Sequence, residues 1–489
     1  MVDGFAGRRP KETYNHRVVI LAIDQGTTGT TCLVVDDELD TRGRGYREFP
    51  QHYPQPGWVE HDPEELWASV LGAAEDAVRS AGVQPSELRA IGITNQRETT
   101  VLWQRATGRP VAPAIVWQDR RTAERCRELP ADLLRARTGL VPDPYFSATK
   151  LEWLLARTDV PRSELAFGTV DSWLVWKLTG GRIHATDLTN ASRTMLLDLD
   201  SLDWDDELLD LFGVERALLP RLVSSSEVVG EAELLGVKVS IAGIAGDQQA
   251  ALFGHGCFER GEAKATYGTG SFVLANAGAE RGPVPAGLLE TVAASGGYAL
   301  EGAILASGAA IQWLRDGLGI LADAAESERL ARTVESTGGV TFVPAFAGLG
   351  SPHWNADARG LISGITRGTT RAHLVRAALE GIAFQVADVL DVLPGGVEVL
   401  RADGGASANG FLMQFQADLL GCPVEVAAEL QTTALGAAAL AGRAIGLWPD
   451  DEAIRTRLRR GAVYEPAADR DSIAARRADW RAALDRALL

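Results

Sequence analysis

Two short stretches of this chain combine a turn of glycine and threonine with apolar residues on both sides. The first is VVILAIDQGTTGTTCLVV at residues 18–35, and the second is KATYGTGSFVLAN at residues 264–276. Each pattern predicts a β-hairpin. Glycine allows left-handed backbone angles and close approach to a ligand, and successive N–H groups in such a turn can bind an anion. Two such turns facing each other would hold a polyphosphate, although turns of this composition also serve conformation alone.

Asp24 strengthens the phosphate interpretation, because it ends the first apolar strand just before the first turn. A carboxylate beside a phosphate needs a cation between them. Mg²⁺ is typically held by one or two carboxylates, water and phosphate oxygens. The alternative is an aspartate that hydrogen-bonds the backbone of its own turn.

A third stretch, LRADGGASANGFLMQF at residues 400–415, reads as a strand, a small-residue loop and a helix that begins near Asn409. The base and ribose of a nucleotide could lie against the backbone of such a loop, because small residues allow close approach. The sequence contains no GxxxxGK[ST] motif, which excludes a P-loop kinase.

Composition narrows the class of protein. The 489 residues carry a formal net charge of −17, which argues against nucleic acid and anionic membranes as partners. The four cysteines lie far apart and form no CxxC pair, as is typical of a reducing compartment. Residues 1–17 are polar and lack the apolar core of a secretory signal. No uncharged apolar run approaches the ~20 residues of a membrane helix, so we expect a cytoplasmic protein without membrane insertion.

The elements that must position these residues alternate between strand and helix, which predicts an α/β fold. Asp62 is the expected N-cap of a helix over 61–82, with Glu65 placed for a capping box and Gly82 as the C-cap. The polar segment 255–263 is the predicted domain boundary, and each half opens with one of the two hairpins. The other expected elements are strands at 17–24, 30–36, 88–94 and 397–403, a strand and helix within 238–254, and helices at 304–319, 370–393, 409–421 and 432–446.

Several longer motifs, in this order, resemble those of the FGGY family of carbohydrate kinases over roughly residues 17–450. They are PGWVEHDP, IGITNQRETT, PAIVWQDRRTAE, TGLVPDPYFSATKLEW, TNASRTMLLD, GIAGDQQAALFG, TYGTGSF and GLGSPHWNADARG. The resemblance implies two duplicated ribonuclease H-like domains of the actin/hexokinase/Hsp70 type with a cleft between them. It places an N-terminal kinase domain at 17–256 and a C-terminal one at 257–489.

The motifs are most similar to those of family members that phosphorylate glycerol, and the resemblance assigns roles by position. Arg97 and Glu98 match residues that bind glycerol hydroxyls, Asp247 matches the catalytic base, and Gln248 matches a further hydroxyl ligand. Trp117, Tyr145 and Phe272 match an aromatic wall against the glycerol carbons. Asp24 and Asp247 match Mg²⁺-associated carboxylates. The matching nucleotide contacts are Thr27, Thr28, Gly29, Thr269, Gly308, Gln312, Gly405 and Asn409. Family members often carry an arginine after the first turn, where this chain has Gly29, Thr30 and Thr31.

Arg97 and Glu98 are neighbours, and on a regular strand their side chains would point to opposite faces. They can serve one ligand only if the chain bends there, and an exposed loop pair is the simpler reading of the sequence. A polyol nevertheless needs what this pair offers, since arginine supplies rigid donors and an ionised glutamate accepts from hydroxyls.

Asp247 lies between an apolar strand and a helix, where an N-cap aspartate is the simplest structural interpretation. At the mouth of a cleft the same carboxylate would accept a hydroxyl proton. With ATP and Mg²⁺ as cofactors, the resemblance implies glycerol phosphorylation to sn-glycerol 3-phosphate, the entry step of glycerol catabolism. A kinase for another small polyol or sugar and a nucleotide-binding scaffold of the same fold are the alternatives. A homodimer or homotetramer is compatible with each.

Overall fold

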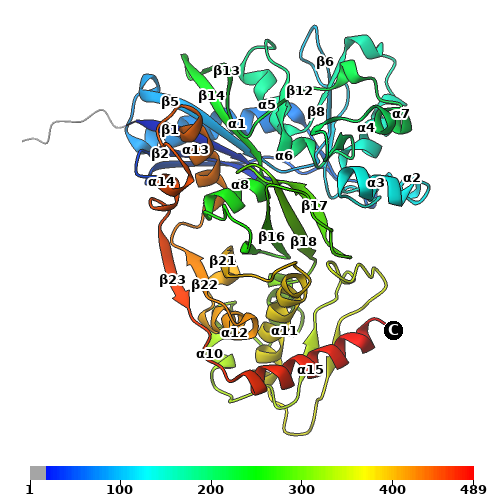
Figure 1. Cartoon of the computed structure of the whole chain (residues 1–489), viewed down its shortest axis with the longest axis vertical. Helices are drawn as coiled ribbons and strands as arrows, with labels where there is room; N and C mark the ends of the chain where they lie inside the picture. Colours follow the sequence, from blue (N-terminus) through cyan, green and yellow to red (C-terminus); the bar gives the residue numbers. More distant parts are fainter. Residues whose placement is uncertain (1–17) are drawn as a thin grey trace, which may run out of the picture.

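Two mixed β-sheets form the framework of the protein, one in the upper and one in the lower lobe of Figure 1. The computed structural model describes residues 18–489, and the polar leader at 1–17 lies outside the described residues. The first sheet has the order β13 (Ser226–Leu234), β14 (Val237–Gly246), β5 (Leu88–Asn95), β1 (Val19–Gln25), β2 (Gly29–Asp36) and β3 (Thr41–Glu48). The second has the order β17 (Leu289–Val292), β18 (Tyr298–Ile304), β16 (Ser271–Gly278), β15 (Glu262–Tyr267), β21 (Val399–Asp403), β22 (Val424–Ala427) and β23 (Arg460–Tyr464).

The two predicted hairpins occupy equivalent places in the two sheets. In the first, β1 pairs antiparallel with β2 and parallel with β5. In the second, β15 pairs antiparallel with β16 and parallel with β21. Beyond the hairpin each sheet continues with an antiparallel strand, β3 or β18, and beyond the parallel partner with β14 or β22. The internal duplication expected from the sequence is therefore a duplication of sheet topology.

The glycines of the two turns do not act as expected. None of Gly26, Gly29, Gly268 and Gly270 has a positive φ, so the left-handed backbone anticipated for them is wrong. At Gly29 and Gly270 a neighbouring strand lies too close for a side chain. A Cβ at Gly270 would lie 2.3 Å from the carbonyl oxygen of Ile304, and one at Gly29 would lie 2.7 Å from the Tyr46 ring.

Helices cover both faces of the first sheet. Alternate residues of β1 and β2 pack with α1 (Pro63–Ala81) and α5 (Val170–Leu178) on one face, and with α8 (Asp247–Gly254) and α13 (Thr432–Ala444) on the other. Helix α1 has the predicted Asp62 N-cap and a left-handed Gly82 C-cap. The expected capping box is not formed, because the Glu65 carboxylate accepts from His52 instead.

The other helices and short strands complete the two lobes. The upper lobe adds β4 (Glu60–His61), β6 (Val101–Gln104), β7 (Ala114–Ile115), α2 (Ala123–Arg127), α3 (Ala131–Thr138), α4 (Ser147–Leu155), β8 (Leu165–Gly168), β9 (Ala185–Asp187), α6 (Leu188–Ala191), β10 (Leu197–Asp198), β11 (Asp203–Trp204), α7 (Asp206–Phe212) and β12 (Arg221–Val223). The lower lobe adds α9 (Gly308–Gln312), α10 (Glu326–Ala331), β19 (Thr341–Val343), β20 (Leu361–Ser363), α11 (Arg371–Asp391), α12 (Gly410–Leu420) and α15 (Arg470–Ala487). The single helix expected at 304–319 is wrong: β18 runs to Ile304, and α9 is followed by one π-helical turn at Trp313–Gly317.

The C-terminal half of the chain returns to the first sheet. Helix α13 and the short α14 (Asp451–Arg455) pack against β1 and β2 of the upper lobe before β23 leads down again (Figure 1). Helix α13 lies very close to its neighbours, since a Cβ at Gly92 of β5 would lie 2.1 Å from the Ala437 carbonyl oxygen. This explains the small residues of 432–446 and confirms the helix predicted there.

The chain therefore passes between the lobes three times, at 255–261, 428–431 and 456–459. The first of these passages lies in the predicted boundary segment, but the division at residues 256 and 257 stays a prediction. No helix within residues 18–489 has both the length and the apolar character needed to cross a membrane.

Candidate active site

Arg97 and Glu98 lie at a sharp bend directly after β5. The strand ends at Asn95, Glu98 has a φ of 61°, and the Thr99 N–H donates to the Arg97 carbonyl oxygen at 2.7 Å. This three-residue turn is the bend that the two residues need to serve one ligand. Both side chains are almost fully buried, with 2% and 1% exposed, so an exposed loop pair is wrong. A non-glycine residue held at such an angle is a form of strain found often at functional sites.

The Arg97 guanidinium is the centre of a buried polar cluster. It donates to Glu301 through both terminal nitrogens, at 2.5 and 3.1 Å, and to the Tyr145 hydroxyl at 3.2 Å. Its Nε lies 3.1 Å from Asp247 Oδ1. Three of the predicted site residues, in the bend after β5, at the start of α8 and in the segment before α4, are therefore joined by one side chain.

Glu98 is held by a second buried arginine, Arg193, whose Nε donates to Glu98 Oε1 at 2.7 Å. The Arg193 Nη2 also donates to Glu301 Oε1 at 3.0 Å. Burial raises the pKa of Glu98, and the two arginines act in the opposite direction. For Glu301, burial would raise the pKa, but Arg193 and Arg97 lower it to about 2. Glu301 is therefore ionised at neutral pH and fixes both guanidinium groups.

Asp247 is the first residue of α8, and Gly246 takes the N-cap position, so the N-cap interpretation of Asp247 is wrong. The carboxylate is 31% exposed, whereas Arg97 beside it is buried. Asp24 lies near the end of β1, and burial followed by the charge of Asp247 raises its pKa to about 7. A carboxylate whose ionisation is disfavoured by a second carboxylate belongs to a donor set that a divalent cation would stabilise.

Gln248, the next predicted residue, contacts a buried lysine. The Lys264 Nζ donates to Gln248 Oε1 and, at 3.0 Å, to Thr266 Oγ1. Burial lowers the pKa of Lys264 to about 8, although the nearby carboxylates Asp403 and Asp247 oppose this shift. Phe272 is partly buried in β16, and its carbonyl oxygen accepts from the same lysine at 3.5 Å.

Two predicted aromatic residues join the first turn to this cluster. The rings of Trp117 and Tyr145 meet edge to face with centroids 5.6 Å apart. The Trp117 indole N–H donates to Thr27 Oγ1 at 2.9 Å. The predicted glycerol wall and the predicted phosphate turn are thus in direct contact.

The second turn is tied to the start of α9. The Gly308 N–H donates to the Gly268 carbonyl oxygen at 2.9 Å, and the Ala309 N–H donates to that of Thr269 at 3.0 Å. A Cβ at Gly308 would lie 2.6 Å from the Gly268 oxygen, so this position requires glycine. Thr28 of the first turn, Thr269 and Gln312 are exposed, which leaves them accessible to a ligand.

The two predicted residues of the adenosine loop, Gly405 and Asn409, have different surroundings. Gly405 is exposed, and a Cβ there would meet no atom within 4 Å, so its backbone faces open space. Asn409 is the N-cap of α12, because its Oδ1 accepts from the Leu412 N–H at 3.0 Å. Its Nδ2 donates to Ser327 Oγ at 3.1 Å, so both ends of its amide already have partners within the fold.

Three residues of the cluster are absent from the sequence-based assignment: Arg193, Lys264 and Glu301. Arg193 lies within TNASRTMLLD and Lys264 opens the second hairpin, so both stand in stretches already singled out. Glu301 interrupts the apolar strand YALEGAI. A charged residue in the middle of a buried strand is the signal that would have identified it, because such a charge needs a partner.

The chain matches two models of known families. Residues 19–254 match the N-terminal domain of the FGGY family of carbohydrate kinases, and residues 263–445 match the C-terminal domain of that family.

Similar proteins cover nearly the whole chain. Glycerol kinase 2 of Thermotoga maritima is 51% identical, with 96% of this chain and 98% of the relative covered. A glycerol kinase of Trichlorobacter lovleyi is 53% identical over the same shares. Among solved structures, the glycerol kinase of Plasmodium falciparum with ADP is 35% identical and superposes with a TM-score of 0.91, covering 97% of this chain and 99% of its own.

Proposed function

The chain belongs to the FGGY family of carbohydrate kinases, and we propose that it transfers the γ-phosphoryl group of ATP to glycerol, forming ADP and sn-glycerol 3-phosphate. The observation that carries the choice of acceptor is the similarity of about 50% over nearly the full length to proteins that are glycerol kinases. A solved relative with ADP supports ATP as the donor. The duplicated sheets and the buried cluster around Arg97 supply a physical basis for the reaction.

In this proposal the cluster binds the acceptor. Arg97 supplies donors and Glu98 an acceptor for the glycerol hydroxyls, and Gln248 is a further hydroxyl ligand. Arg193 and Glu301 hold the first two in place through contacts of 2.7–3.1 Å. Because these contacts already orient Arg97 and Glu98, the site needs little reorganisation when glycerol arrives.

Trp117, Tyr145 and Phe272 would line the carbon face of the acceptor. Aromatic rings around a small polyol exclude water, and a kinase must keep water from replacing its acceptor. The edge-to-face contact of Trp117 and Tyr145 fixes the two rings relative to each other.

The chemical step follows from the position of Asp247. Its carboxylate accepts the proton of the attacking glycerol hydroxyl while the oxygen forms a bond to the γ-phosphorus. The bond from that phosphorus to the bridging β–γ oxygen breaks, and ADP leaves with the electron pair. Arg97 Nε lies 3.1 Å from Asp247 Oδ1, which orients the carboxylate.

The donor set fits Mg²⁺ bound with ATP. Among residues 18–489 no group of three or more His, Cys, Asp or Glu could hold a metal by itself. Mg²⁺ at phosphates needs only one or two protein carboxylates, and Asp24 and Asp247 supply them. When bound, Mg²⁺ neutralises phosphate charge, which matters in a chain with a net charge of −17.

The nucleotide contacts extend from the two turns to the lower lobe. The exposed residues Thr28, Thr269, Gln312 and Gly405 suit direct contacts, with Thr27, Gly29 and Gly308 shaping the turns. Asn409 would position the loop through its capping bonds. Four separate cysteines and an ATP-dependent reaction favour the cytoplasm as the site of action.

An acceptor screen tests the proposal. Purified enzyme with Mg²⁺ and ATP is offered glycerol, dihydroxyacetone, erythritol or xylulose, and ADP release is measured with and without each. We expect glycerol to give the highest kcat/KM. A higher value for another acceptor would favour a different polyol kinase, and acceptor-independent ADP release would favour a nucleotide-binding scaffold.

A further inference from the structure

Lys264 is a charged residue in the interior of the second sheet. It lies in β15 and is fully buried, with 0% exposed. Only five of the 48 basic residues of this chain are lysines. A lysine is almost never fully buried unless its ammonium group is paired, so the partners of Lys264 indicate what it does.

Three acceptors surround the Lys264 ammonium group, which has three N–H donors and no acceptor of its own. Two of them belong to the second hairpin: Thr266 Oγ1 lies at 3.0 Å and the Phe272 carbonyl oxygen at 3.5 Å. The third is Oε1 of Gln248, on α8. The hairpin therefore holds the lysine in place, and the lysine holds a side chain that is predicted to bind glycerol.

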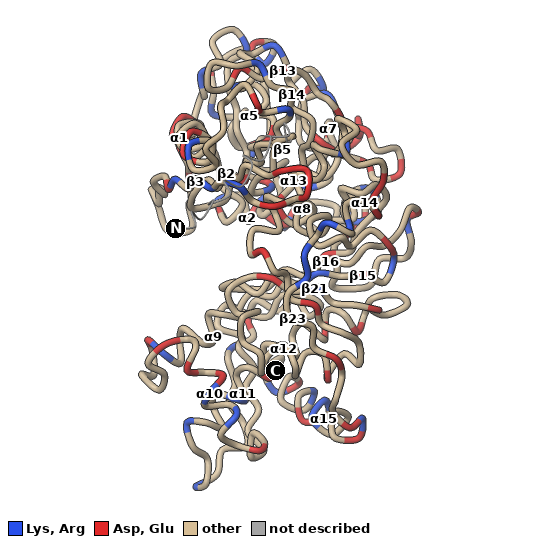
Figure 2. Tube along the Cα trace, turned by 90° about the vertical axis from the view of Figure 1, so that its left-hand side faces the viewer, with Lys and Arg blue, Asp and Glu red and all other residues tan. Residues whose placement is uncertain are grey.

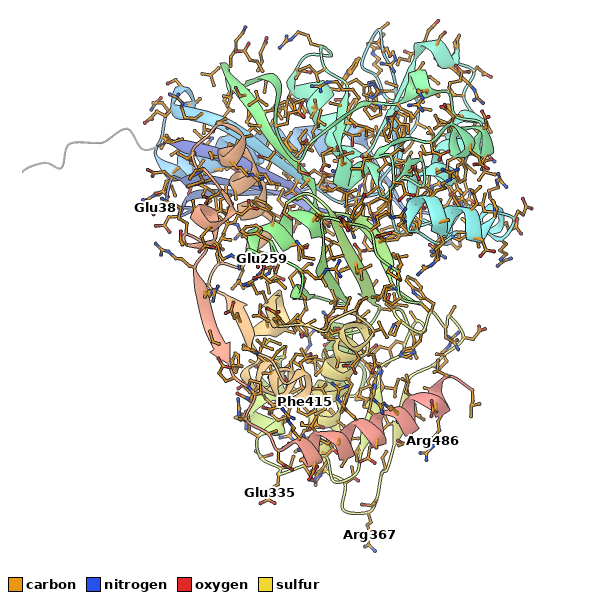
Figure 3. The ribbon with its side chains drawn as sticks, in the orientation of Figure 1. Glu38, Glu259, Glu335, Arg367, Phe415 and Arg486 are labelled. Carbon is orange, nitrogen blue, oxygen red and sulfur yellow. The ribbon has the colours of Figure 1, made fainter. Side chains whose placement is uncertain are left out.

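This contact joins two segments that the first passage separates. Helix α8 ends at Gly254, and β15 begins at Glu262. Glu259, which is labelled in Figure 3, lies in the passage between them. In Figure 2, β15 and β16 lie below α8, at the level where the lobes meet. Lys264 therefore links the second hairpin to the proposed glycerol site.

The direction of each hydrogen bond around Lys264 is determined by the groups that take part. Burial would raise the pKa of Asp403, but His255, the nearby ammonium group and a hydrogen bond with Thr266 hold it well below its usual range. The Thr266 hydroxyl thus donates its hydrogen to an ionised carboxylate, and its oxygen accepts from Lys264. Burial lowers the pKa of Lys264 to about 8, so the amine is mostly protonated at neutral pH and donates to Gln248 as well.

The amide orientation of Gln248 follows from this contact. An amide accepts through its oxygen and donates through its nitrogen, so the reversed orientation would place two donors against each other. Within residues 18–489 the Gln248 Nε2 has no hydrogen-bond partner, and the side chain is only partly buried. Gln249 differs, because its oxygen accepts from Arg97 and its nitrogen donates to Thr291. Gln248 is thus the residue of this pair that has a donor left for a ligand.

We propose that Lys264 is a positioning residue for the acceptor, because it orients Gln248 so that Nε2 donates to a hydroxyl oxygen of glycerol. The inference rests on the proposed glycerol kinase function and adds the direction of one hydrogen bond to it. Asp247, the preceding residue, accepts a hydroxyl proton in that proposal, so the two neighbours offer glycerol one acceptor and one donor. The donor is oriented before glycerol arrives, which lowers the entropic cost of binding.

A double-mutant cycle tests whether Lys264 acts through Gln248. The Kd of glycerol is measured by titration calorimetry on the full chain for the wild type, Lys264→Met, Gln248→Leu and the double variant, without nucleotide or Mg²⁺. We expect each single change to raise the Kd by about 5-fold or more, since one frees the amide to turn and the other removes it. The double variant should bind no more weakly than Gln248→Leu. If the two effects multiply instead, Lys264 acts independently of Gln248 and the proposal is overturned.

Gln248→Glu tests the direction of the hydrogen bond to glycerol. This change keeps the length of the side chain and an oxygen for Lys264, but it replaces the donor by a second acceptor. The Kd of glycerol should rise by about 10-fold or more. An unchanged or lower Kd would mean that an acceptor serves glycerol as well as a donor does, which contradicts the proposal. If Lys264→Met fails to fold, this variant still decides the question.

Arg401→Met is the matched control. Arg401 stands beside Lys264 on β21 and is also buried, but it pairs with Glu262 and Glu425 outside the site. It should bind glycerol as the wild type does, and an equal loss in both variants would assign Lys264 a general structural role. A wild-type chain that binds no glycerol would refute the proposed function itself, whereas equal affinity in the wild type and Lys264→Met would refute only the positioning role.

Discussion

Replacing Glu301 by glutamine removes one charge from the centre of the buried cluster while it keeps the size of the side chain. In the wild type this carboxylate accepts three hydrogen bonds, two from Arg97 and one from Arg193, at 2.5–3.1 Å. Glutamine offers one acceptor oxygen, and its amide group would face a guanidinium donor. Two buried arginines would then share fewer acceptors, which is a strongly destabilising situation.

The expected size of the effect follows from the pKa of Glu301. The interactions in the folded protein lower it from 4.5 to about 2. At about 1.4 kcal/mol for each tenfold change in the proton equilibrium, the ionised carboxylate contributes about 3 kcal/mol to the free energy of unfolding. Because the folded pKa lies below the unfolded one, this contribution is present above pH 4.5 and is lost as the pH falls toward 2.

Two measurements at neutral pH examine this reasoning. Urea unfolding of Glu301→Gln should show a loss of about 3 kcal/mol. Steady-state kinetics should show at least a 10-fold loss in kcat/KM for glycerol and little change in the KM for ATP. The reason is that Glu301 holds Arg97 in place but does not hold the nucleotide turns.

Glu290→Gln is the control, since Glu290 is equally buried in the same sheet and accepts from Arg281 at 2.8 Å away from the cluster. It should lose stability without losing activity toward glycerol. The reasoning is refuted if Glu301→Gln keeps the wild-type kcat/KM, or if Glu290→Gln loses it to the same extent.

Three further outcomes follow from the site and its surroundings. Asp247→Asn keeps the shape of the side chain but removes the proton acceptor, so turnover should fall by about 10²-fold or more while equilibrium dialysis still detects bound glycerol. Near-normal turnover would exclude Asp247 as the base. Arg97→Ala should lower kcat/KM for glycerol by about 10-fold or more with unchanged ATP affinity, and a change in ATP affinity instead would assign Arg97 to the nucleotide site. Burial and the neighbouring His52 lower the pKa of His61 to about 4, so the neutral imidazole contributes fully to stability above pH 6.5, and about 3 kcal/mol of the free energy of unfolding is lost as the pH falls to 4. The free energy of unfolding of His61→Gln should therefore depend less on pH across this range, and an equal dependence would contradict the lowered pKa.

Local patterns in the sequence were enough to predict the elements that carry the site. The two hairpins, helix α1 with its Asp62 cap and the helix that begins at Asn409 all depend on residues close together in the chain. The bend at Glu98 could be stated only as a requirement for Arg97 and Glu98 to serve one ligand. The sequence could not predict it, because the φ angle of a single residue depends on its surroundings in the fold. Its neighbour Ser147 donates to the Glu98 carbonyl oxygen from α4 at 3.0 Å.

The partners of the cluster lie beyond the reach of local patterns. Arg97 and Glu301 are 204 positions apart, and nothing near either residue in the chain identifies the other. The same limit applies to α13, because the helix was predicted from the sequence but the sheet against which it packs was not. The role of the turn glycines was mistaken for a related reason, since the obstacle to a side chain at Gly270 is the backbone of Ile304 from a different strand.

The return of α13 to the first sheet has a consequence for how the chain is made. Synthesis delivers α8 about 180 residues before α13, which at typical elongation rates is an interval of roughly 10–40 s. During that time one apolar face of the first sheet, including Ile20, Ala22, Leu33 and Val35, lacks the part of its cover that α13 supplies. The upper lobe therefore cannot complete its core on the ribosome before the lower lobe has largely emerged. Nascent chains that stall between residues 260 and 430 would expose this face, and they are the forms most in need of chaperones.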